Sequence, residues 1–544
     1  MSAGSLEPPD RATLARMSER SAPAWEVVAS RRTKRGFIHA WGTASGERPA
    51  PRAIYLQSEG PDPRRVFGTL QCRTPTDAAR VEVGFSLTGD VAPHDGSALD
   101  WSIVLEWPDG RMQQAALEAG GAARRVSPWQ RYLRTAARLI DGGDFRTLFS
   151  EVQRVLAPEA WSRRDPAAVL AWLRRGGSRL VFVVDHGLGG GANVYGMQRV
   201  AELARQGYAV LRLVPDPWTL GYRLLAQRGN QSRAARVGDL AQLRQLYEGL
   251  RFDQTWFNNV LSFVDTPGVM AAVREWQVRG ALGETTFLVH DFFSVCPSWT
   301  LIDHAGRFCG IPAAEVCARC LPQHRAPFLG LARGATIPEW RQRWAPILQD
   351  VHEVRCFSEA SRALMLRAYP LLPRERLTVV PHQTSELPLR RVGPRDGGAP
   401  VVGVVGTISA QKGSEVLREL CRYLRDSGSS MRLVVAGTVE LELAPEIATV
   451  TGAYRRDELP NLLERHGVNV ALLPSVWPET YSYVTDELMQ MGLPLLVFDL
   501  GAPAERVRGY ARGLVMPIAG PEQIEAALMQ LYARHVAGAR GASA

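Results

Sequence analysis

Two glutamates, Glu479 and Glu487, lie on either side of a predicted helix start in the last third of the sequence. Ser482 is a good N-cap residue, and Gly492 followed by Pro494 is a typical helix stop, so we expect a helix between them. Carboxylates accept paired hydrogen bonds from vicinal hydroxyls such as those of ribose or hexose, and a helix N-terminus favours phosphate. The pattern therefore indicates a site for a sugar joined to a diphosphate. The alternative is that these acids only complement the helix dipole.

A lysine-containing loop follows the apolar run Val401–Val405 and extends from Gly406 to Gly413. Lys412 stands at its end, immediately before a helix predicted over Ser414–Arg425. A lysine at a helix start can place a positive charge on a phosphate while the first amides add donors. The residue order differs from that of a Walker A loop, which needs Gly-Lys followed by Ser or Thr. We expect a phosphate contact here, with a solvent-facing lysine as the alternative.

A glycine-rich loop follows another buried strand, predicted over Leu180–Val184, and precedes a helix. Glycines let a ligand approach the backbone, and the amides at the helix start can face an anion. The spacing also fits a dinucleotide fingerprint, but the acidic partner expected about 20 positions later would be Asp216, which follows a proline in a predicted loop. A plain tight turn is the alternative to an anion site, for which the candidates are Gly189, Gly190, Gly191 and Ala192.

Strands and helices alternate in two long stretches, residues 178–382 and 401–534. Strands that alternate with helices of about 10–15 residues predict parallel sheets covered by helices on both faces. The Pro- and Gly-rich residues 383–400 are expected to link the two units. We therefore predict an α/β fold with two doubly wound, Rossmann-like domains, at residues 178–395 and 396–544. Such sheets bind ligands at the carboxyl ends of their strands.

The first third of the chain has a different pattern. Residues 1–22 are expected to form a flexible N-terminus. Residues 23–125 contain short strand-like runs separated by turn signals, which predicts a small β-sandwich. Residues 126–177 have apolar residues at helical spacing and are expected to form a helical connector. The sandwich region contains no chemical constellation, so we expect it to have a packing or binding role.

Taken in order, these motifs over residues 178–535 resemble those of GT-B glycosyltransferases of family 4. The C-terminal half of that family has a Gly…Lys-Gly loop and a Glu-x7-Glu pair, matched here by Gly406…Lys412-Gly413 and Glu479…Glu487. Its N-terminal half has a glycine-rich loop, a histidine after a strand and a serine at a strand-to-helix turn, matched here by Gly189–Ala192, His290 and Ser358. More loosely, the β-sandwich resembles an accessory domain of bacterial polysaccharide and O-antigen glycosyltransferases.

The resemblance implies a role for each matched residue. Glu487 would hold the ribose, Glu479 the donor sugar, and His290 would contact the donor near the reacting carbon. The glycine-rich loop and Ser358 would serve the acceptor or a phosphate. The leaving diphosphate would be stabilised by Lys412 and by the residues Thr480, Tyr481, Ser482 and Tyr483. Transfer would retain the anomeric configuration and need no metal or other catalytic cofactor. The chain departs from the family at Thr407, where an arginine usually joins the lysine; either a neighbouring arginine substitutes or the donor site is weakened.

Four of the seven cysteines cluster at Cys296, Cys309, Cys317 and Cys320. In a protein expected to be cytosolic, this pattern indicates a metal site before a disulfide framework. A structural zinc ion on four thiolates would pin a segment that has little core of its own. Free thiols or a redox pair are the alternatives, and His304 and His324 are alternative ligands.

The composition favours anionic partners. The 544 residues include 64 Lys and Arg against 55 Asp and Glu, a formal net charge of +9. No helix-turn-helix, zinc finger or aromatic-plus-basic RNA signature is present, so we expect no nucleic-acid partner. No apolar run approaches the roughly 18 residues of a spanning helix, and Met1–Arg20 lacks a signal-peptide pattern. We expect a cytoplasmic protein that could contact the cytosolic face of a membrane.

The expected reaction is transfer of a sugar from a UDP-, GDP- or dTDP-sugar to a saccharide or lipid-linked saccharide. This chemistry belongs to cell-surface polysaccharide synthesis, such as that of lipopolysaccharide. A sugar-nucleotide epimerase or hydrolase could use the same donor site. A non-catalytic glycan-binding scaffold is suggested by Thr407 and the large N-terminal extension. A Rossmann oxidoreductase would need a clearer nicotinamide fingerprint.

Overall fold

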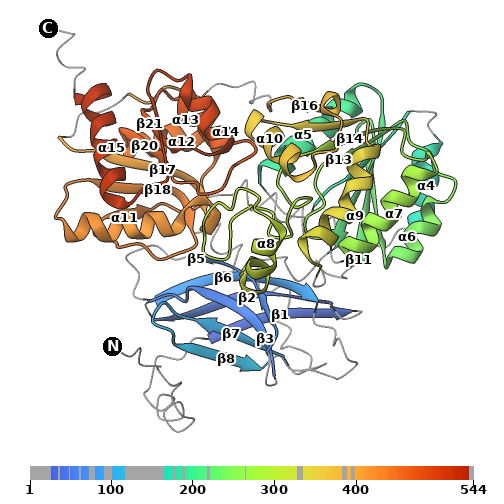
Figure 1. The fold of residues 1–544 in the computed structure, drawn as a ribbon, viewed down its shortest axis with the longest axis horizontal. Coiled ribbons are helices and arrows are strands. Elements are labelled where there is room, and N and C mark those ends of the chain that lie inside the picture. The colour runs from blue at the N-terminus through green and yellow to red at the C-terminus, as the bar shows by residue number, and fades with distance from the viewer. Residues whose placement is uncertain are drawn as a thin grey trace.

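A β-rich N-terminal domain and two α/β domains make up the part of the chain that the structure describes (Figure 1). The two α/β domains stand next to each other, and the β-rich domain lies below both (Figure 1). The predicted flexible N-terminus, Gly189 and most of the predicted connector lie outside the described residues. This computed structural model describes residues 26–34, 37–47, 49–59, 63–72, 80–90, 101–116, 165–175, 179–186, 190–216, 221–263, 265–326, 335–382, 389–393 and 398–537.

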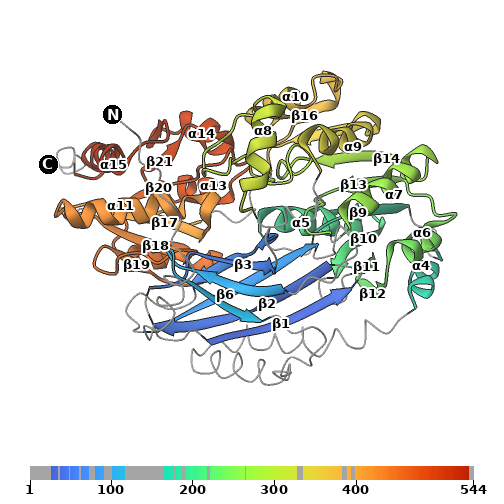
Figure 2. The same ribbon diagram turned by 60° about the horizontal axis from the view of Figure 1, so that its bottom comes forward.

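The N-terminal domain consists of two four-stranded antiparallel sheets, ordered β1-β2-β6-β5 and β4-β3-β7-β8. Alternate side chains of the two sheets share one apolar core, as the period of two along a strand dictates. Figure 2 shows this domain lying across the edge of both α/β domains. The strands are β1 (Glu26–Lys34), β2 (Phe37–Glu47), β3 (Ala53–Ser58), β4 (Arg65–Phe67), β5 (Thr69–Cys72), β6 (Arg80–Asp90), β7 (Trp101–Glu106) and β8 (Met112–Ala116).

The first α/β domain has one eight-stranded sheet, ordered β12-β11-β10-β9-β13-β14-β15-β16. The six strands β10, β9, β13, β14, β15 and β16 are parallel to one another. The other two, β11 and β12, form an antiparallel edge that the sequence patterns did not indicate. The strands are β9 (Leu180–Val184), β10 (Ala209–Asp216), β11 (Gly221–Arg228), β12 (Gln231–Val237), β13 (Gln254–Phe257), β14 (Glu284–Leu288), β15 (Glu353–Cys356) and β16 (Leu377–Val379).

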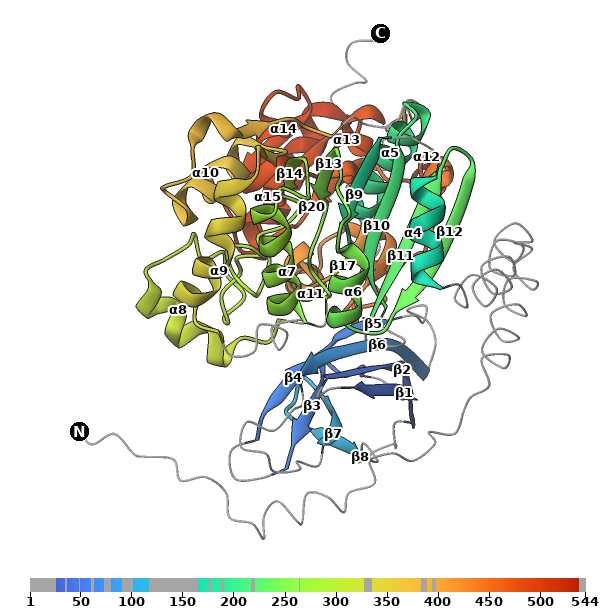
Figure 3. The same cartoon turned by 90° about the vertical axis from the view of Figure 1, so that its right-hand side faces the viewer.

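Helices on both faces of this sheet bury its apolar strands. Helix α4 packs against β11 and β12, so the described end of the predicted connector belongs to this core (Figure 3). The helices are α4 (Pro166–Arg174), α5 (Gly191–Arg205), α6 (Leu240–Tyr247), α7 (Thr266–Val278), α8 (Ala314–Cys320), α9 (Ile337–Asp350) and α10 (Glu359–Ala368), with the 3₁₀ turns η1 (Leu321–Gln323) and η3 (Arg374–Arg376).

The second α/β domain has a parallel six-stranded sheet, ordered β19-β18-β17-β20-β21-β22. One apolar cluster covers each face, and Leu389 and Val392 of the predicted linker pack into one of them. The strands are β17 (Val401–Ile408), β18 (Arg432–Val439), β19 (Ala448–Val450), β20 (Val470–Leu473), β21 (Leu495–Phe498) and β22 (Gly513–Met516). The helices are α11 (Ser414–Asp426), α12 (Leu459–Arg465), α13 (Tyr483–Gln490), α14 (Gly501–Arg508) and α15 (Pro521–His535), with η4 (Ala410–Lys412) and η5 (Arg456–Glu458).

These sheets confirm the predicted α/β fold of two doubly wound domains preceded by a β-sandwich. The strand order reverses between β9 and β13 in the first domain and between β17 and β20 in the second. Ligands of open α/β sheets bind at such reversals, outside the carboxyl ends of the strands. The described residues include no helix that is both long and apolar enough to cross a membrane.

Candidate active site

A chain of polar side chains holds the ring of His290, which follows β14. Its Nε2 atom lies 3.1 Å from Oδ1 of Asn258, which follows β13. Nδ2 of Asn258 donates to Asp185, at the end of β9, over 2.9 Å, and Arg212 pairs with Asp185 at 2.6 Å. The ends of three neighbouring parallel strands therefore supply this network.

His290 is a neutral imidazole with a defined tautomer. Nδ2 of Asn258 donates to Asp185 and to the carbonyl of Ala192, so the Asn258 oxygen accepts a hydrogen bond from Nε2–H of His290. Burial lowers the pKa of His290 well below its usual value, and two neighbouring histidines lower it further. Nδ1 of His290 consequently keeps its lone pair at neutral pH.

Aromatic rings of the first α/β domain contact His290, and one of them continues to a ring of the second domain. Phe357 stacks on it with ring centroids 4.7 Å apart, and Tyr195 lies at 5.2 Å. His382, which follows β16, lies 5.4 Å from His290 and stacks on Tyr481 of the second domain at 4.3 Å. His290 is therefore enclosed by rings that also join the two domains.

The two predicted halves of the site touch directly. The Thr480 hydroxyl donates to the backbone oxygen of His290 over 2.8 Å. The Tyr481 hydroxyl donates to the backbone oxygen of His382 over 3.2 Å. Nδ1 of His382 lies 2.9 Å from the Tyr483 hydroxyl. The structure thus brings together predicted residues that are about 190 positions apart in sequence.

Two helices from different domains begin at this junction. α5 begins after Gly190, which has φ +95° and no side chain to bond the first amides. A Cβ atom on Gly191 would lie 3.2 Å from the Tyr483 ring, so the start of α5 packs against the start of α13. Ser482 is the N-cap of α13, as predicted, and accepts from the amide of Thr485. The positive ends of both helices favour an anionic group here.

Two loops of the second domain pack on each other where β17 and β20 diverge. We call residues 406–413 the lysine loop and residues 474–482 the acidic loop. The amide of Val476, in the acidic loop, donates to the carbonyl of Gln411, in the lysine loop, over 3.0 Å. The two predicted C-terminal motifs therefore form one unit at the strand reversal.

Gly413 makes the close packing of these loops possible. Its φ is +88°, and a Cβ atom here would lie 2.0 Å from the backbone oxygen of Pro474. Glycine meets both requirements, because it adopts positive φ without strain and carries no Cβ. Lys412 precedes it at the end of η4 and so stands at the start of α11.

Glu479 is buried, with 3% of its surface exposed. The hydroxyl of Ser475 donates to its carboxylate, and the amide of Ala502 donates to its backbone oxygen over 2.8 Å. Gly501, with φ +58°, lies so close that a Cβ atom would be 2.5 Å from the Glu479 oxygen. The start of α14 thus packs against the backbone of the acidic loop at Glu479 and donates a hydrogen bond to it.

Glu487 lies on α13 and forms an ion pair with Arg456 at 2.7 Å. Burial raises the pKa of Glu487, and Arg456 counteracts this rise. Thr407, where the resemblance implies an arginine, instead accepts from the Thr438 hydroxyl at 3.4 Å. Gln71 of the sandwich donates to Thr438 over 2.8 Å, which connects the N-terminal domain to the lysine loop.

Ser358 has a structural role in this arrangement. It caps α10, and its hydroxyl lies 2.7 Å from that of Ser361. The first amides of α10, at Glu359 and Ala360, donate to the carboxylate of Glu505 on α14. A protein carboxylate thus accepts from the amides at this helix start, and the acceptor or phosphate role implied for Ser358 stays a prediction.

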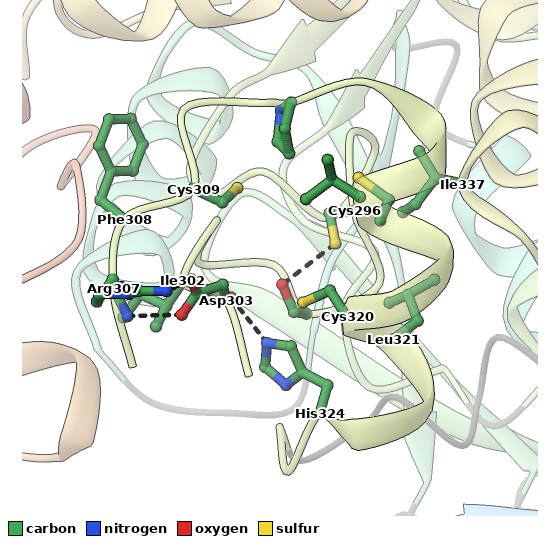
Figure 4. A pocket seen from close by; sticks show the side chains of 14 residues that line it. Cys296, Ile302, Asp303, Arg307, Phe308, Cys309, Cys320, Leu321, His324 and Ile337 are labelled. Atoms are coloured by element: carbon green, nitrogen blue, oxygen red, sulfur yellow. Dashed lines mark hydrogen bonds and ion pairs between the residues drawn. The ribbon is translucent and has the colours of Figure 1, made fainter. Parts of the chain in front are cut away.

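The four clustered cysteines lie apart from this junction, between β14 and α9. All four thiols are free and line one cavity (Figure 4). Among the described residues, no three His, Cys, Asp or Glu side chains already stand in a metal-holding arrangement. Burial raises the pKa of Cys296 to about 11 and raises the pKa of the other three thiols. Redox-active cysteines usually have lowered pKa values, so this setting argues against a redox pair.

Several residues of the site did not follow from the sequence patterns. Asp185 directly follows the predicted strand Leu180–Val184, and Asn258 directly follows β13; polar residues at such positions are a usable signal. His382 and Arg456 lie in irregular segments, and no local pattern marks them. Their positions depend on the packing of one domain against the other.

Comparison with known proteins agrees with this geometry. Residues 399–534, which contain both C-terminal loops, match the family described as glycosyl transferases group 1. With the two facing α/β domains, this match supports a glycosyltransferase of the GT-B type and confirms the resemblance seen in the motifs.

A GDP-mannose-dependent alpha-mannosyltransferase of Mycobacterium tuberculosis is 26% identical over 230 residues, which are 40% of this chain and 56% of the relative. The chain thus spans a little over half the length of that protein. Among solved structures, sucrose-phosphate synthase of Thermosynechococcus elongatus is similar with a TM-score of 0.44 and 14% identity, over 65% of this chain and 90% of that one. HepE of Anabaena, in complex with UDP-glucose, has a TM-score of 0.40 and 14% identity, over 64% and 89%.

Proposed function

We propose that this protein transfers a sugar from a nucleotide-diphosphate donor to the hydroxyl of a saccharide or lipid-linked saccharide. The observation that carries the proposal is the convergence of the lysine loop, the acidic loop and the start of α5 at one interdomain junction. Positive helix ends and a lysine suit a diphosphate, whereas buried carboxylates suit sugar hydroxyls.

The donor would lie mainly on the second domain. Lys412 and the first amides of α11 and α13 would stabilise the charge that builds on the leaving diphosphate. Glu487 would accept hydrogen bonds from the ribose hydroxyls, with Arg456 holding its carboxylate in place. Glu479, oriented by Ser475, would accept from hydroxyls of the donor sugar.

The reaction would break the bond between the anomeric carbon and the β-phosphate oxygen and form a bond to the acceptor oxygen. The acceptor proton would pass to the leaving phosphate oxygen, so that the anomeric configuration is retained without a metal. His290 would present the lone pair of Nδ1 toward the donor sugar, with Asn258 fixing its ring. This use of a neutral imidazole fits its lowered pKa.

The test is incubation of the full chain with a panel of donors and saccharide or lipid-linked acceptors, analysed by mass spectrometry. The panel starts with GDP-mannose, because a relative uses it, and includes UDP- and dTDP-hexoses. We expect a glycosylated acceptor and free nucleoside diphosphate from one donor class. Release of free sugar or an epimerised donor with no transfer to any acceptor would contradict the proposal. Binding of glycans without turnover would contradict it as well.

A further inference from the structure

The segment between β14 and α9 has little regular structure and contains the four clustered cysteines. Its helix α8 has seven residues, and none of them is buried. Three of the four described non-glycine residues with positive φ lie in it: Trp299, Leu301 and Ile311, at 57° to 59°. Such left-handed conformations persist only where the surroundings hold them. Leu301 and Ile311 are buried in the apolar core of the first domain, whereas α8, which contains Cys317 and Cys320, has no such anchor.

The four thiols line a single cavity of about 390 Å³. Cys317 and Cys320 are three residues apart on α8, which places them on one side of the helix. Cys296 and Cys309 come from the loops opposite. Figure 4 shows the labelled sulfurs of Cys296, Cys309 and Cys320 around the same hollow. The four thiols lie within the 25 residues from Cys296 to Cys320, so a single ion bound to all of them would constrain most of this segment.

The other candidate ligands at the cavity already have partners. Nε2 of His324 lies 2.7 Å from the backbone oxygen of Ile302, and its Nδ1 accepts from the amide of Ala326 over 2.9 Å. The carboxylate of Asp303 accepts from two backbone amides of its own turn, each over 2.9 Å. His304 does not line the cavity. Two of the four sulfurs, those of Cys296 and Cys320, also have polar partners, but sulfur hydrogen bonds are weak, so the four thiols are the remaining ligand set.

Polar groups already approach two of these sulfurs. The amide of His304 donates to Sγ of Cys320 over 3.3 Å. The hydroxyl of Ser298 lies 3.2 Å from Sγ of Cys296. Amide donors favour thiolates over thiols, and hydrogen bonds of this kind support sulfur ligands of a metal.

We propose that Cys296, Cys309, Cys317 and Cys320 bind one zinc ion as a structural site. Thiolates select soft ions such as zinc, and four of them give the closed tetrahedral shell of structural zinc. Binding requires the thiols to turn inward, to sulfur–zinc distances of about 2.3 Å, and to release their protons.

The zinc site would hold together the place where the three domains meet. Arg325, just beyond α8, pairs with Glu106 of the sandwich at 3.4 Å and lies over the ring of Phe67. Trp299 packs against Trp477 of the acidic loop, with ring centroids 5.6 Å apart. The segment thus contacts both the sandwich and the loop that contains Glu479.

The test is elemental analysis of the full chain, purified without chelators or a metal-affinity tag. We expect about one zinc per chain, as a closed tetrahedral site binds a single ion. The double variant Cys317→Ser/Cys320→Ser should lose at least about nine-tenths of it, since two thiolates do not complete the shell. Cys72→Ser, in the sandwich, is the matched control and should keep the zinc.

A second measurement uses only the unmodified chain, in case the double variant does not fold. Titration with an organomercurial, in the presence of a zinc-sensitive dye, should release zinc in step with the modification of thiols. Zinc below about one-tenth equivalent in the wild type would overturn the proposal, as would zinc that the double variant retains. Iron with inorganic sulfide would also overturn it, because that is a cluster and not a single ion. None of these readouts depends on glycosyl transfer.

Discussion

At the scale of single residues, the site combines charged groups that are paired with partners from other elements. Glu487 has Arg456, Asp185 has Arg212, and Asn258 links Asp185 to His290. Buried charges are costly unless they are paired, so these partners are what allows the carboxylates to lie inside the junction. The pairing also fixes where each oxygen points, which a ligand with vicinal hydroxyls requires.

Glu487→Ala should weaken binding of the nucleoside diphosphate that the donor panel identifies about 10- to 100-fold, the loss expected when hydrogen bonds to a charged group are removed. Calorimetric titration with that nucleotide and with its 2′,3′-dideoxy analogue measures this. If Glu487 holds the ribose, the wild type prefers the nucleotide with both hydroxyls and the variant binds the two alike. Glu464→Ala is the control, because Glu464 lies on α12 and pairs with the exposed Arg390. An unchanged preference in Glu487→Ala would remove the ribose role.

At the scale of elements, the two loops of the second domain depend on glycines more than on helix or strand propensity. The lysine loop can approach Pro474 only because Gly413 has no Cβ, and Gly501 allows the same approach beneath Glu479. Both have positive φ, so an alanine at either place would meet strain and a steric clash together.

Gly413→Ala should reduce the affinity for the nucleoside diphosphate of the donor at least about tenfold, since the loops must move apart and Lys412 then loses its charged contact with the diphosphate. Gly428→Ala is a matched control, because Gly428 also has positive φ but has open space around it. The control should lose about 1 kcal/mol of stability and keep its affinity. Thermal unfolding and calorimetric titration give both values. Equal affinities for the two variants would show that the close packing does not position the donor site.

At the scale of the whole molecule, neutral histidines hold the junction between the α/β domains. Burial lowers the pKa of His382 to about 3 and lowers the pKa of His290 and His186. Because these values are depressed in the folded state, the unfolded chain binds more protons as the pH falls below about 6.5. The associated stability is complete above that pH and is lost progressively toward pH 3.

The free energy of unfolding should therefore fall between pH 6.5 and 4.5, by up to about 1.4 kcal/mol per pH unit for each such histidine, and the midpoint of thermal unfolding should fall with it. His382→Gln should reduce the number of protons taken up on acid unfolding by roughly one and so lessen the slope of stability against pH. Glutamine can still form a hydrogen bond with Tyr483 but does not titrate. His466→Gln, after α12, is the control. Calorimetric scans at several pH values measure the slopes. Parallel slopes for the wild type and His382→Gln would rule out His382 as a source of the acid sensitivity.

The sequence was informative where local physics decides the outcome. Alternating strands and helices predicted both doubly wound sheets, and the cap and stop signals around α13 predicted a helix that the structure places at Tyr483–Gln490. Both predictions depend on periodicity or on neighbouring residues, which a single chain displays directly. The glycosyltransferase expectation came from the resemblance of the ordered motifs to those of a known family, and the family match supports it.

Tertiary packing decided the rest. The β11–β12 edge, the place of α4 in the first domain, and the positions of His382 and Arg456 all depend on contacts between segments far apart in the chain. The contact of Glu505 with the first amides of α10 likewise depends on the packing of one domain against the other. The sequence by itself thus determined which elements form and which residues end them. Only the tertiary structure decided which of those residues meet, because the partners of a buried polar group are set by topology and not by sequence spacing.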